Sequence, residues 1–333
     1  KPLLNKIANM SVKDGKKHIL IGKMFGYTCP IDMDEIYVLM DKEKPYYSIT
    51  FRVDNIDQMG VFCPLQNKHI KTKLQNVSFD FLIISTGVIL APQKIPGLVE
   101  NGFNLYDHNQ LLEIRNKLES IESGKIAISI MGMPYKCPPA PFEASLLIDS
   151  MLRKRGVRDS VEINFYSPAP ITLPAAGAEI SKKILELVNA EKITFHNSCK
   201  IKSVESKKLI FENSEADFDL LLAIPPHIAP KIIYDSGLAN NPGFIPIDRD
   251  CKTSFENIFA IGDVTTLSAG ENLAVPKAGI FAEGEGITVA KNIISKIQLK
   301  KETALFDGNG GCFIESGRDS AAVLQVDMFS HSK

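Results

Sequence analysis

The sequence lacks long apolar runs, a net charge of one sign and paired cysteines. Its longest apolar stretches, FDFLIIS near Phe79 and DLLLAIPP near Asp219, are far shorter than the roughly 20 residues of a membrane-spanning helix. No basic start leads into the apolar core of a secretory signal. We therefore expect a cytoplasmic protein, and peripheral contact with a membrane stays open.

The charge balance is close to neutral, with 38 lysines and arginines against 39 aspartates and glutamates. Such a chain has no overall field that would attract nucleic acid, so we expect no nucleic-acid partner. The six cysteines have no C-x-x-C spacing and the six histidines have no ligand spacing, which argues against a metal site. With 44% hydrophobic residues over 333 positions, the chain can bury a large core without disulfide bonds.

Short apolar runs that stop at glycine turns indicate buried strands. One run ends at Ser-Thr-Gly (85–87), and another ends at Gly-Asp (262–263), with a long helix predicted over 277–297 after it. Between these strand ends, the apolar run KIAISIMG (125–132) leads through a proline-rich turn into an amphipathic helix predicted over 142–155. This order of strand, turn and helix is typical of an α/β nucleotide-binding fold.

The segment from 161 to 224 continues the alternation, with strand-like runs on both sides of the helix-like run EISKKILELVNA. It predicts a mostly parallel sheet with a small antiparallel attachment. Two more strand-like pieces, HILIG and SITFRVD, lie in the less regular first 75 residues. No internal repeat or low-complexity tract interrupts the pattern.

The turn MGMPYKCPPAP (131–141) stands where a dinucleotide-binding protein needs a glycine-rich loop. Its four prolines have no N–H group to offer a pyrophosphate, so the turn is poorly suited to a nicotinamide cofactor. It presents Cys137 instead, a few residues before a helix. We expect the positive helix N-terminus and Lys136 to favour the thiolate and make Cys137 reactive. The alternative is a small buried cysteine with a packing role.

The two strand ends and the proline turn together resemble the two-dinucleotide-domain flavoproteins of the pyridine nucleotide-disulfide oxidoreductase family. The resemblance narrows with YKCPPAPFEASLLIDSMLRKRGVRD, VPKAGIFAEGEG and GGCFIESG, which look like the sulfide:quinone oxidoreductase and flavocytochrome c sulfide dehydrogenase group. It covers residues 79–329. It implies an α/β protein of two Rossmann-like, three-layer domains, a FAD-binding domain over 1–98 and 243–333 and an NAD-binding-like domain over 99–242 that carries the redox cysteine.

The resemblance implies FAD as the cofactor and names the residues around it, which are Thr86, Gly87, Gly262, Asp263, Pro276, Lys277, Ala278 and Gly279. Glycine lets the backbone approach a cofactor closely, and a carboxylate accepts hydrogen bonds from ribityl hydroxyls. Lys277 or the helix N-terminus after it would stabilise negative charge on the reduced ring. The alternatives are ordinary strand-ending turns and a solvated lysine at a helix start.

The same resemblance implies that Cys137 and Cys312 form a redox-active sulfur pair facing the flavin. Glycines 308, 310 and 311 would give Cys312 the unusual backbone needed to reach a flat ring. Sulfide would attack a disulfide or polysulfide between the two cysteines, and the electrons would pass through FAD to a quinone or cytochrome. Glu143 either manages protons near Cys137 or simply occupies the first helical turn.

Two departures from the family stand against this interpretation. The G-x-G-x-x-G strand that holds the ADP half of FAD is absent from residues 1–75, so the first domain lacks its N-terminal βαβ unit. We expect that strand to lie outside this sequence, because a sheet without its central strand would expose apolar edges. A third cysteine of many quinone-reducing members is replaced by Asp107. The resemblance therefore implies a small sulfur compound as the substrate, with sulfide as one example.

Two rival functions and the assembly state remain open from the sequence. One rival is an NAD(P)H-dependent flavin or disulfide reductase, or an enzyme like type II NADH dehydrogenase. The other is a non-catalytic remnant of the fold without flavin. Homo-oligomer formation is neither favoured nor excluded by the residues.

Overall fold

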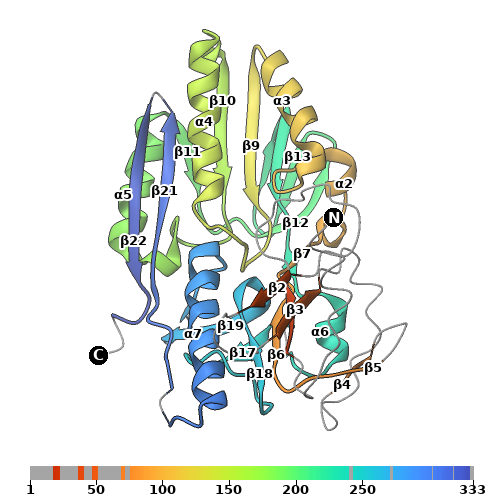
Figure 1. Ribbon diagram of the computed structural model, residues 1–333. Helices are drawn as coiled ribbons and strands as arrows, with labels where there is room; N and C mark the ends of the chain where they lie inside the picture. Colours follow the sequence, from red (N-terminus) through yellow and green to blue (C-terminus); the bar gives the residue numbers. More distant parts are fainter. Residues whose placement is uncertain are drawn as a thin grey trace, which may run out of the picture.

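The computed structural model describes residues 79–330, apart from 240–242, 271–272, 302 and 318, together with the backbone of five earlier strands. These strands are β1 (His18–Gly22), β2 (Tyr37–Met40), β3 (Tyr47–Phe51), β4 (His69–Lys71) and β5 (Asn76–Ser78). The protein consists of two α/β units, one above the other, and the chain passes from the lower unit to the upper and back (Figure 1).

The lower unit is built on a sheet with the strand order β18-β6-β1-β3-β2, in which only the edge strand β2 runs antiparallel. Its later strands are β6 (Leu82–Ser85) and β18 (Ile258–Ala260). Because β6 and β18 are parallel neighbours, their carboxyl ends at Thr86 and Gly262 meet at one edge of the sheet. The strands predicted at HILIG and SITFRVD are confirmed as β1 and β3.

Helix α7 (Gly279–Ile297) and a small second sheet complete the core of the lower unit. Phe281 and Val289 of α7 are buried in one apolar cluster with Leu82 and Phe259 of the main sheet. The small sheet has the order β17-β19-β20. Its strands are β17 (Ile245–Ile247), β19 (Thr265–Gly270) and β20 (Leu273–Ala274). Helix α7 confirms the helix predicted over 277–297 and begins two residues later than predicted.

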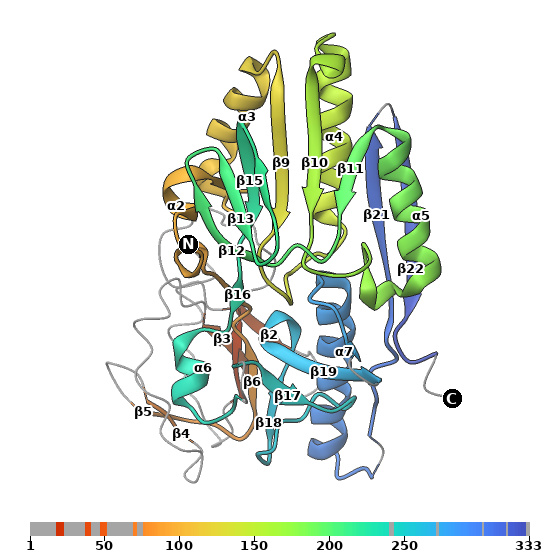
Figure 2. The same cartoon turned by 180° about the vertical axis from the view of Figure 1, so that it is seen from behind.

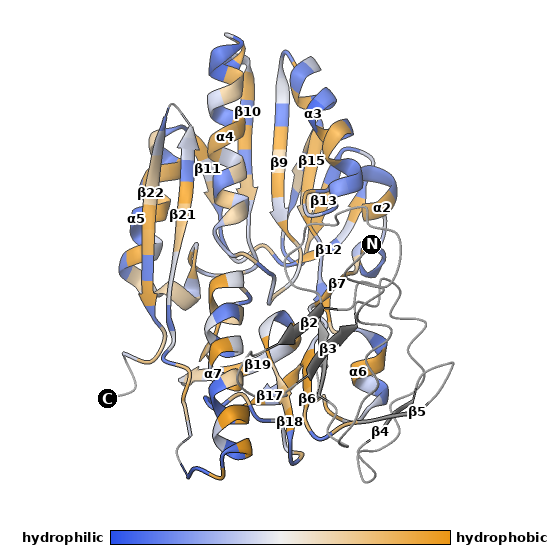
Figure 3. Ribbon diagram, viewed as in Figure 1, coloured by the Kyte–Doolittle hydropathy of each residue, from blue (hydrophilic) through white to orange (hydrophobic). Residues whose placement is uncertain are grey.

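The upper unit contains a second sheet in which all strands are parallel, in the order β11-β10-β9-β15-β8. The strands are β8 (Phe103–Asn104), β9 (Gly124–Ile130), β10 (Val161–Tyr166), β11 (Ile193–His196) and β15 (Leu220–Ile224). Every residue of β15 is buried, as expected for a parallel strand covered on both faces. Figure 3 shows these strands as mainly hydrophobic, which agrees with their apolar runs in the sequence.

Three helices and an antiparallel attachment flank the upper sheet, as the alternating pattern predicts. The helices are α3 (Leu111–Ser120), α4 (Ala140–Lys154) and α5 (Gly177–Ala190). The attachment consists of β12 (Ile201–Glu205), β13 (Lys208–Phe211) and β14 (Glu215–Asp217), and it is seen best from behind (Figure 2). The predicted α/β fold class with two Rossmann-like units is confirmed.

The two units are joined by two short pieces of chain at their junction. Strand β7 (Ile89–Leu90), on the way up, pairs with β16 (His227–Ile228), on the way down. The remaining short helices, α2 (Leu98–Asn101) and α6 (Lys231–Asp235), follow these crossings. A second link comes from the proline turn, where Lys136 and Lys277 form an isolated parallel bridge.

The last two strands, β21 (Asn309–Gly317) and β22 (Ser320–Asp327), form a hairpin beside α4 and α5 (Figure 1). Ile314 of this hairpin is fully buried in the apolar cluster of the upper unit. A Cβ atom at Gly317 would lie 2.4 Å from the Cβ of Ser150 on α4, so the two elements are in close contact. The hairpin thus packs on the upper unit, although the proposed division of the chain places it with the lower one.

No helix in the described part of the chain has both the length and the hydropathy that a bilayer crossing requires.

Candidate active site

A cavity of about 470 Å³ lies where the proline turn, the start of α7 and the C-terminal hairpin meet. Both Cys137 and Cys312 line it, although they are 175 positions apart in the sequence. Its other walls are mainly apolar and include Leu173, Phe244, Val275, Phe281 and Leu324. The tertiary structure therefore brings the two predicted redox cysteines to one largely apolar pocket.

The backbone holds Cys137 in an unusual conformation. Its φ angle is +50°, in the left-handed region that non-glycine residues rarely adopt. Its N–H donates to the carbonyl of Lys277 at 2.6 Å, and its carbonyl accepts from the Tyr106 hydroxyl at 3.2 Å and from the N–H of Ala140 at 3.0 Å. Three hydrogen bonds, one within the turn and two to other segments, thus fix this strained residue at the entrance to α4.

The expectation that Cys137 is a stabilised thiolate is wrong for the protein as described. Cys137 is exposed by its accessible surface, but desolvation by the protein around the thiol raises its pKa to about 11, with a further contribution from Cys312. The hydrogen bond from the start of α4, at Ala140, acts in the opposite direction and is the smaller effect. Desolvation of the charged form outweighs the helix N-terminus here.

Cys312 lies on β21 with its thiol donating to the carbonyl of Phe313 at 3.3 Å. Burial raises the pKa of this thiol too, and the carboxylate of Glu143 adds to the shift. The prediction about the glycines before Cys312 is correct only for Gly308, whose φ is +79°. Gly310 and Gly311 are needed for space, since a Cβ atom would lie 2.4 Å from the ring of Phe281 or 3.3 Å from the carbonyl of Leu324.

Glu143 connects the two elements that carry the cysteines. It sits in the first turn of α4, half-buried, and its carboxylate accepts a hydrogen bond from the backbone N–H of Glu315 on β21. Burial raises the pKa of Glu143, and its charge raises the pKa of both Cys137 and Cys312. A group that affects both thiols in this way is well placed to exchange protons with them.

Lys277 is buried, so the alternative of a solvated lysine at a helix start is wrong. Its ammonium group donates to the carbonyls of Asp263 at 2.6 Å and Thr265 at 2.9 Å, and lies 3.6 Å from the ring centroid of Phe244. Burial lowers the pKa of Lys277 to about 8, against the opposing effects of Asp263 and Glu285. At pH 7 the group is still mainly a cation, placed at the wall of the cavity.

The Gly-Asp strand end has a second acidic partner that the sequence patterns did not reveal. The N–H of Gly262 donates to the carboxylate of Glu285 at 2.6 Å. Glu285 is on the inward face of α7, only 2% exposed, and burial raises its pKa to about 7. Burial also raises the pKa of Asp263. The sequence signal for this group was a glutamate at a position of α7 where the helical period places core residues.

The Thr-Gly strand end combines an unsatisfied buried hydroxyl with room beside a glycine. The Oγ1 atom of Thr86 is buried and has no hydrogen-bond partner among the described residues. Gly87 has a φ of +66°, and no described atom lies within 4 Å of the position that its Cβ would take. Buried polar atoms rarely lack a partner, so an orphaned hydroxyl beside open space indicates a missing ligand.

These residues fit a bound flavin. Helix α7 has 19 residues and no side chain capping its N-terminus, and Ala278 and Gly279 at that end line the cavity. An uncapped helix N-terminus favours negative charge, as on a reduced flavin ring. Pro276 and Lys277 complete the same wall. Gly262, with a φ of +74°, and Asp263 lie at the adjoining strand end, where a ribityl chain would need acceptors.

The remaining candidate residues have structural roles or no site around them. Asp107, which replaces the third family cysteine, caps a short 3-10 turn by accepting from the N–H of Asn109 at 3.0 Å. Cys251 is buried, Cys199 is partly exposed, and neither lines the cavity. Cys29 and Cys63 lie outside the described residues. Across the described residues, no group of three or more His, Cys, Asp or Glu could hold a metal ion.

Comparisons with known proteins show what the chain is similar to. Residues 150–292 match the family described as Pyridine nucleotide-disulphide oxidoreductase. The chain is 28% identical over 232 residues to the mitochondrial sulfide:quinone oxidoreductase of Dictyostelium discoideum, covering 66% of this chain and 51% of that protein. It is 25% identical over 263 residues to the sulfide-quinone reductase of Aquifex aeolicus, covering 74% and 61%. The chain thus spans between half and three fifths of these relatives' length.

Solved structures show the same fold. The sulfide:quinone oxidoreductase of Aquifex aeolicus superimposes with a TM-score of 0.71 at 20% identity, covering 85% of this chain and 72% of that one. A NAD-dependent persulfide reductase from A. fulgidus gives a TM-score of 0.55 at 18% identity, covering 77% and 46%. The predicted resemblance to the sulfide:quinone oxidoreductase group is confirmed.

Proposed function

We propose that this chain is the sulfur- and flavin-reacting part of a FAD-dependent oxidoreductase. It oxidises sulfide or a related small sulfur compound through Cys137 and Cys312 and passes the electrons through FAD to a quinone. The observation that carries the proposal is that both cysteines line one cavity with the N-terminus of α7 and Lys277. The names of the two curated relatives support sulfide as the donor and a quinone as the acceptor.

The cysteine pair performs thiol–disulfide exchange. In the oxidised state the sulfurs of Cys137 and Cys312 are joined, directly or through further sulfur. Sulfide attacks one of the two, so that a new S–S bond forms, the bond between the cysteines breaks, and the other sulfur leaves as a thiolate. A second sulfur nucleophile then removes the added sulfur atom. Rejoining of the two reduced cysteine sulfurs releases two electrons, for which bound FAD supplies the acceptor.

Protons move in each of these steps because the pKa of both thiols is raised. Glu143 exchanges these protons, since its carboxylate is coupled to both sulfurs and is held by the N–H of Glu315. The mainly apolar walls of the cavity limit the water around the sulfur pair. Lys277 and the start of α7 supply positive potential on the cofactor side.

The residues that would hold FAD are those of the two strand ends and of the segment before α7. They are Thr86, Gly87, Gly262, Asp263, Pro276, Lys277, Ala278 and Gly279. Thr86 would hydrogen-bond the cofactor through its orphaned hydroxyl, and Asp263 would accept from the ribityl hydroxyls. The ADP half lacks a G-x-G-x-x-G loop in residues 1–75, so its binding must use other residues or another segment.

An anaerobic titration tests the proposal. Purified full-length chain is loaded with FAD, and the flavin absorbance is followed while sulfide or NADH is added. We expect bleaching by sulfide and none by NADH. Bleaching by NADH alone would favour the rival NAD(P)H-dependent flavin or disulfide reductase, and a protein that takes up no FAD would favour a non-catalytic remnant of the fold.

The proline turn argues against the nicotinamide alternative. Pro138 and Pro139 have no N–H group, and Tyr135 fills the start of the turn with its hydroxyl donating to the carbonyl of Pro138 at 3.1 Å. A dinucleotide pyrophosphate would find few free amides at this point.

A cytochrome remains the second candidate for the electron acceptor. A quinone dissolves in the lipid bilayer, so reduction of a quinone would place a cytoplasmic protein in peripheral contact with a membrane, and a homo-oligomer is compatible with this arrangement.

A further inference from the structure

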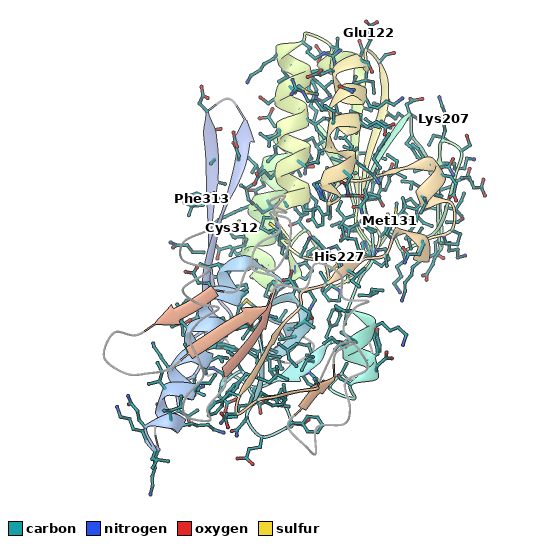
Figure 4. All side chains as sticks on the ribbon, turned by 45° about the vertical axis from the view of Figure 1, so that its right-hand side comes forward. Glu122, Met131, Lys207, His227, Cys312 and Phe313 are labelled. Atoms are coloured by element: carbon teal, nitrogen blue, oxygen red, sulfur yellow. The ribbon has the colours of Figure 1, made fainter. Side chains whose placement is uncertain are left out.

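His227 has a position at the junction of the two units that the proposed chemistry does not explain. It lies on β16, paired with Leu90 of β7, and is only 5% exposed. Figure 4 shows His227 at the level where the upper and lower units meet, the same level as Cys312. It is not among the residues that line the cavity containing the two thiols.

The hydrogen bonds of His227 determine which ring nitrogen carries the proton. Nδ1 lies 2.8 Å from the carbonyl oxygen of Pro225, which can only accept. Nδ1 therefore donates, and in the neutral ring Nε2 has the free lone pair. Burial and the positive charges of Lys136 and Lys277 lower the pKa of His227 to about 4, so the ring is neutral at pH 7. The edge-on ring of Tyr106, at 5.7 Å between centroids, packs against it.

The lone pair on Nε2 is buried and has no hydrogen-bond partner among the described residues. The same holds for Oγ1 of Thr86, which lies three residues before β7 begins. Since β7 pairs with β16, the two orphaned atoms belong to the two chain crossings that run side by side. An unsatisfied buried acceptor costs free energy, so two of them at one junction point to a ligand that supplies donors.

The ligand must offer a hydrogen-bond donor to a neutral acceptor. A sulfur substrate in the thiol cavity does not meet this need, because His227 lies outside that cavity. The oxidised isoalloxazine ring of a flavin carries one N–H group at its edge, and this ring belongs to the ligand that Thr86 and Gly87 already fit. We propose that Nε2 of His227 accepts a hydrogen bond from an N–H group of the bound flavin ring and thereby positions the cofactor at the junction. The inference rests on FAD binding as proposed above.

A pair of substitutions separates this role from simple packing. In His227→Asn the side-chain amide can still donate to Pro225, but no acceptor remains at the Nε2 position. In His227→Gln the longer side chain places an acceptor oxygen near Nε2. We expect the Asn variant to bind FAD about tenfold more weakly or to shift its reduction potential, and the Gln variant to stay within about threefold of the wild type. Equal behaviour of the two variants would overturn the proposal.

A measurement on the unmodified chain covers the case in which a variant does not fold. Nitrogen-15 NMR of histidine-labelled full-length protein reports Nε2 directly, because a lone pair that receives a hydrogen bond shifts its resonance strongly. We expect the Nε2 signal of His227 to move when FAD is added and Nδ1 to stay protonated. If FAD binds without moving this signal, the role of His227 is wrong, while FAD binding as proposed above still stands. Flavin that binds but is not reduced by sulfide contradicts only the sulfide oxidation proposed above.

Discussion

The two cysteines of the cavity are held in contrasting ways. Cys137 belongs to a proline-rich turn with a left-handed backbone, and it is fixed by hydrogen bonds to Ala140 in the same turn and to Lys277 and Tyr106 in other segments. Cys312 belongs to an antiparallel hairpin whose position depends on docking against α4. Its neighbour Phe313 is 68% exposed, while Ile314 is fully buried.

The contrast shows that hydrogen bonds to the backbone hold one cysteine, whereas apolar packing of its strand holds the other. A turn with hydrogen bonds from several sides does not depend on the docking of the hairpin, whereas Cys312 does. Changes that loosen the hairpin should therefore affect the sulfur chemistry without disturbing the turn, and changes among the buried charges near Lys277 should act on the turn and the cofactor instead.

The largest effect is expected from removing either sulfur, whichever way it is held. Cys137→Ser and Cys312→Ser should each lower the rate of flavin reduction by sulfide by about a thousandfold or more, because one sulfur alone cannot form the exchanging pair. Stopped-flow absorbance with anaerobic sulfide measures the rate, and flavin content should stay nearly unchanged. Cys199→Ser, a partly exposed thiol outside the cavity, is the control; full turnover in either active-site variant contradicts the mechanism.

Docking of the hairpin is tested by two adjacent residues that point in opposite directions. Ile314→Ala should lower the free energy of unfolding by about 2–4 kcal/mol, because it leaves a cavity in the core shared with α4. Phe313→Ala, an exposed neighbour, should change it by less than about 0.5 kcal/mol. Urea denaturation provides both values. Equal effects would show that the hairpin is not docked as described.

Glu285, which accepts a hydrogen bond from Gly262, should make the stability of the protein sensitive to pH. Its pKa in the folded state, about 7, is above the ordinary value of 4.5. As pH rises, the unfolded state therefore loses this proton at a lower pH than the folded state does. Stability is therefore highest below pH 4.5 for this group and falls as pH rises toward and through 7. The loss from pH 5.5 to 7 is about 1.5 kcal/mol.

Glu285→Gln should remove this loss, since the amide oxygen can still accept from Gly262 without becoming charged. Urea unfolding at pH 5.5 and pH 7 compares the variant with the wild type. Glu283→Gln, an exposed position on the same helix, is the matched control and should keep the wild-type dependence. An unchanged pH dependence in Glu285→Gln would show that another group causes the loss.

The smallest effect is expected on the flavin itself. The pKa of Lys277 is lowered to about 8, so its positive charge is present at pH 7 and is lost as pH rises through 8. Lys277→Met should lower the flavin reduction potential at pH 7 by about 30 mV, a factor of ten in the equilibrium constant. Dye equilibration at pH 7 and pH 9 measures it. Lys277→Arg, which stays charged, should keep the potential of the wild type at pH 7. If the wild type and both variants have the same potential, Lys277 is not part of the cofactor site.

The strands, the helices and much of the candidate site were predictable because their signals are local. Apolar runs that stop at Ser-Thr-Gly and Gly-Asp predict β6 and β18, and the proline turn singles out Cys137 through its residue types alone. The motif resemblance adds Cys312. The residues around Cys312 do not show by themselves which cavity the strand that carries it would line.

The tertiary structure decided the protonation of the ionisable groups, the space around the site residues and their hydrogen-bond partners. The helix start beside Cys137 predicts a thiolate, but desolvation of the thiol and the nearby Cys312 raise its pKa. Glu285 and His227 look ordinary in the sequence because their neighbours, Gly262 and Tyr106, come from other elements. Residue order determines periodicity and turn chemistry over a few positions, while desolvation and unsatisfied hydrogen bonds depend on what the fold packs around each group.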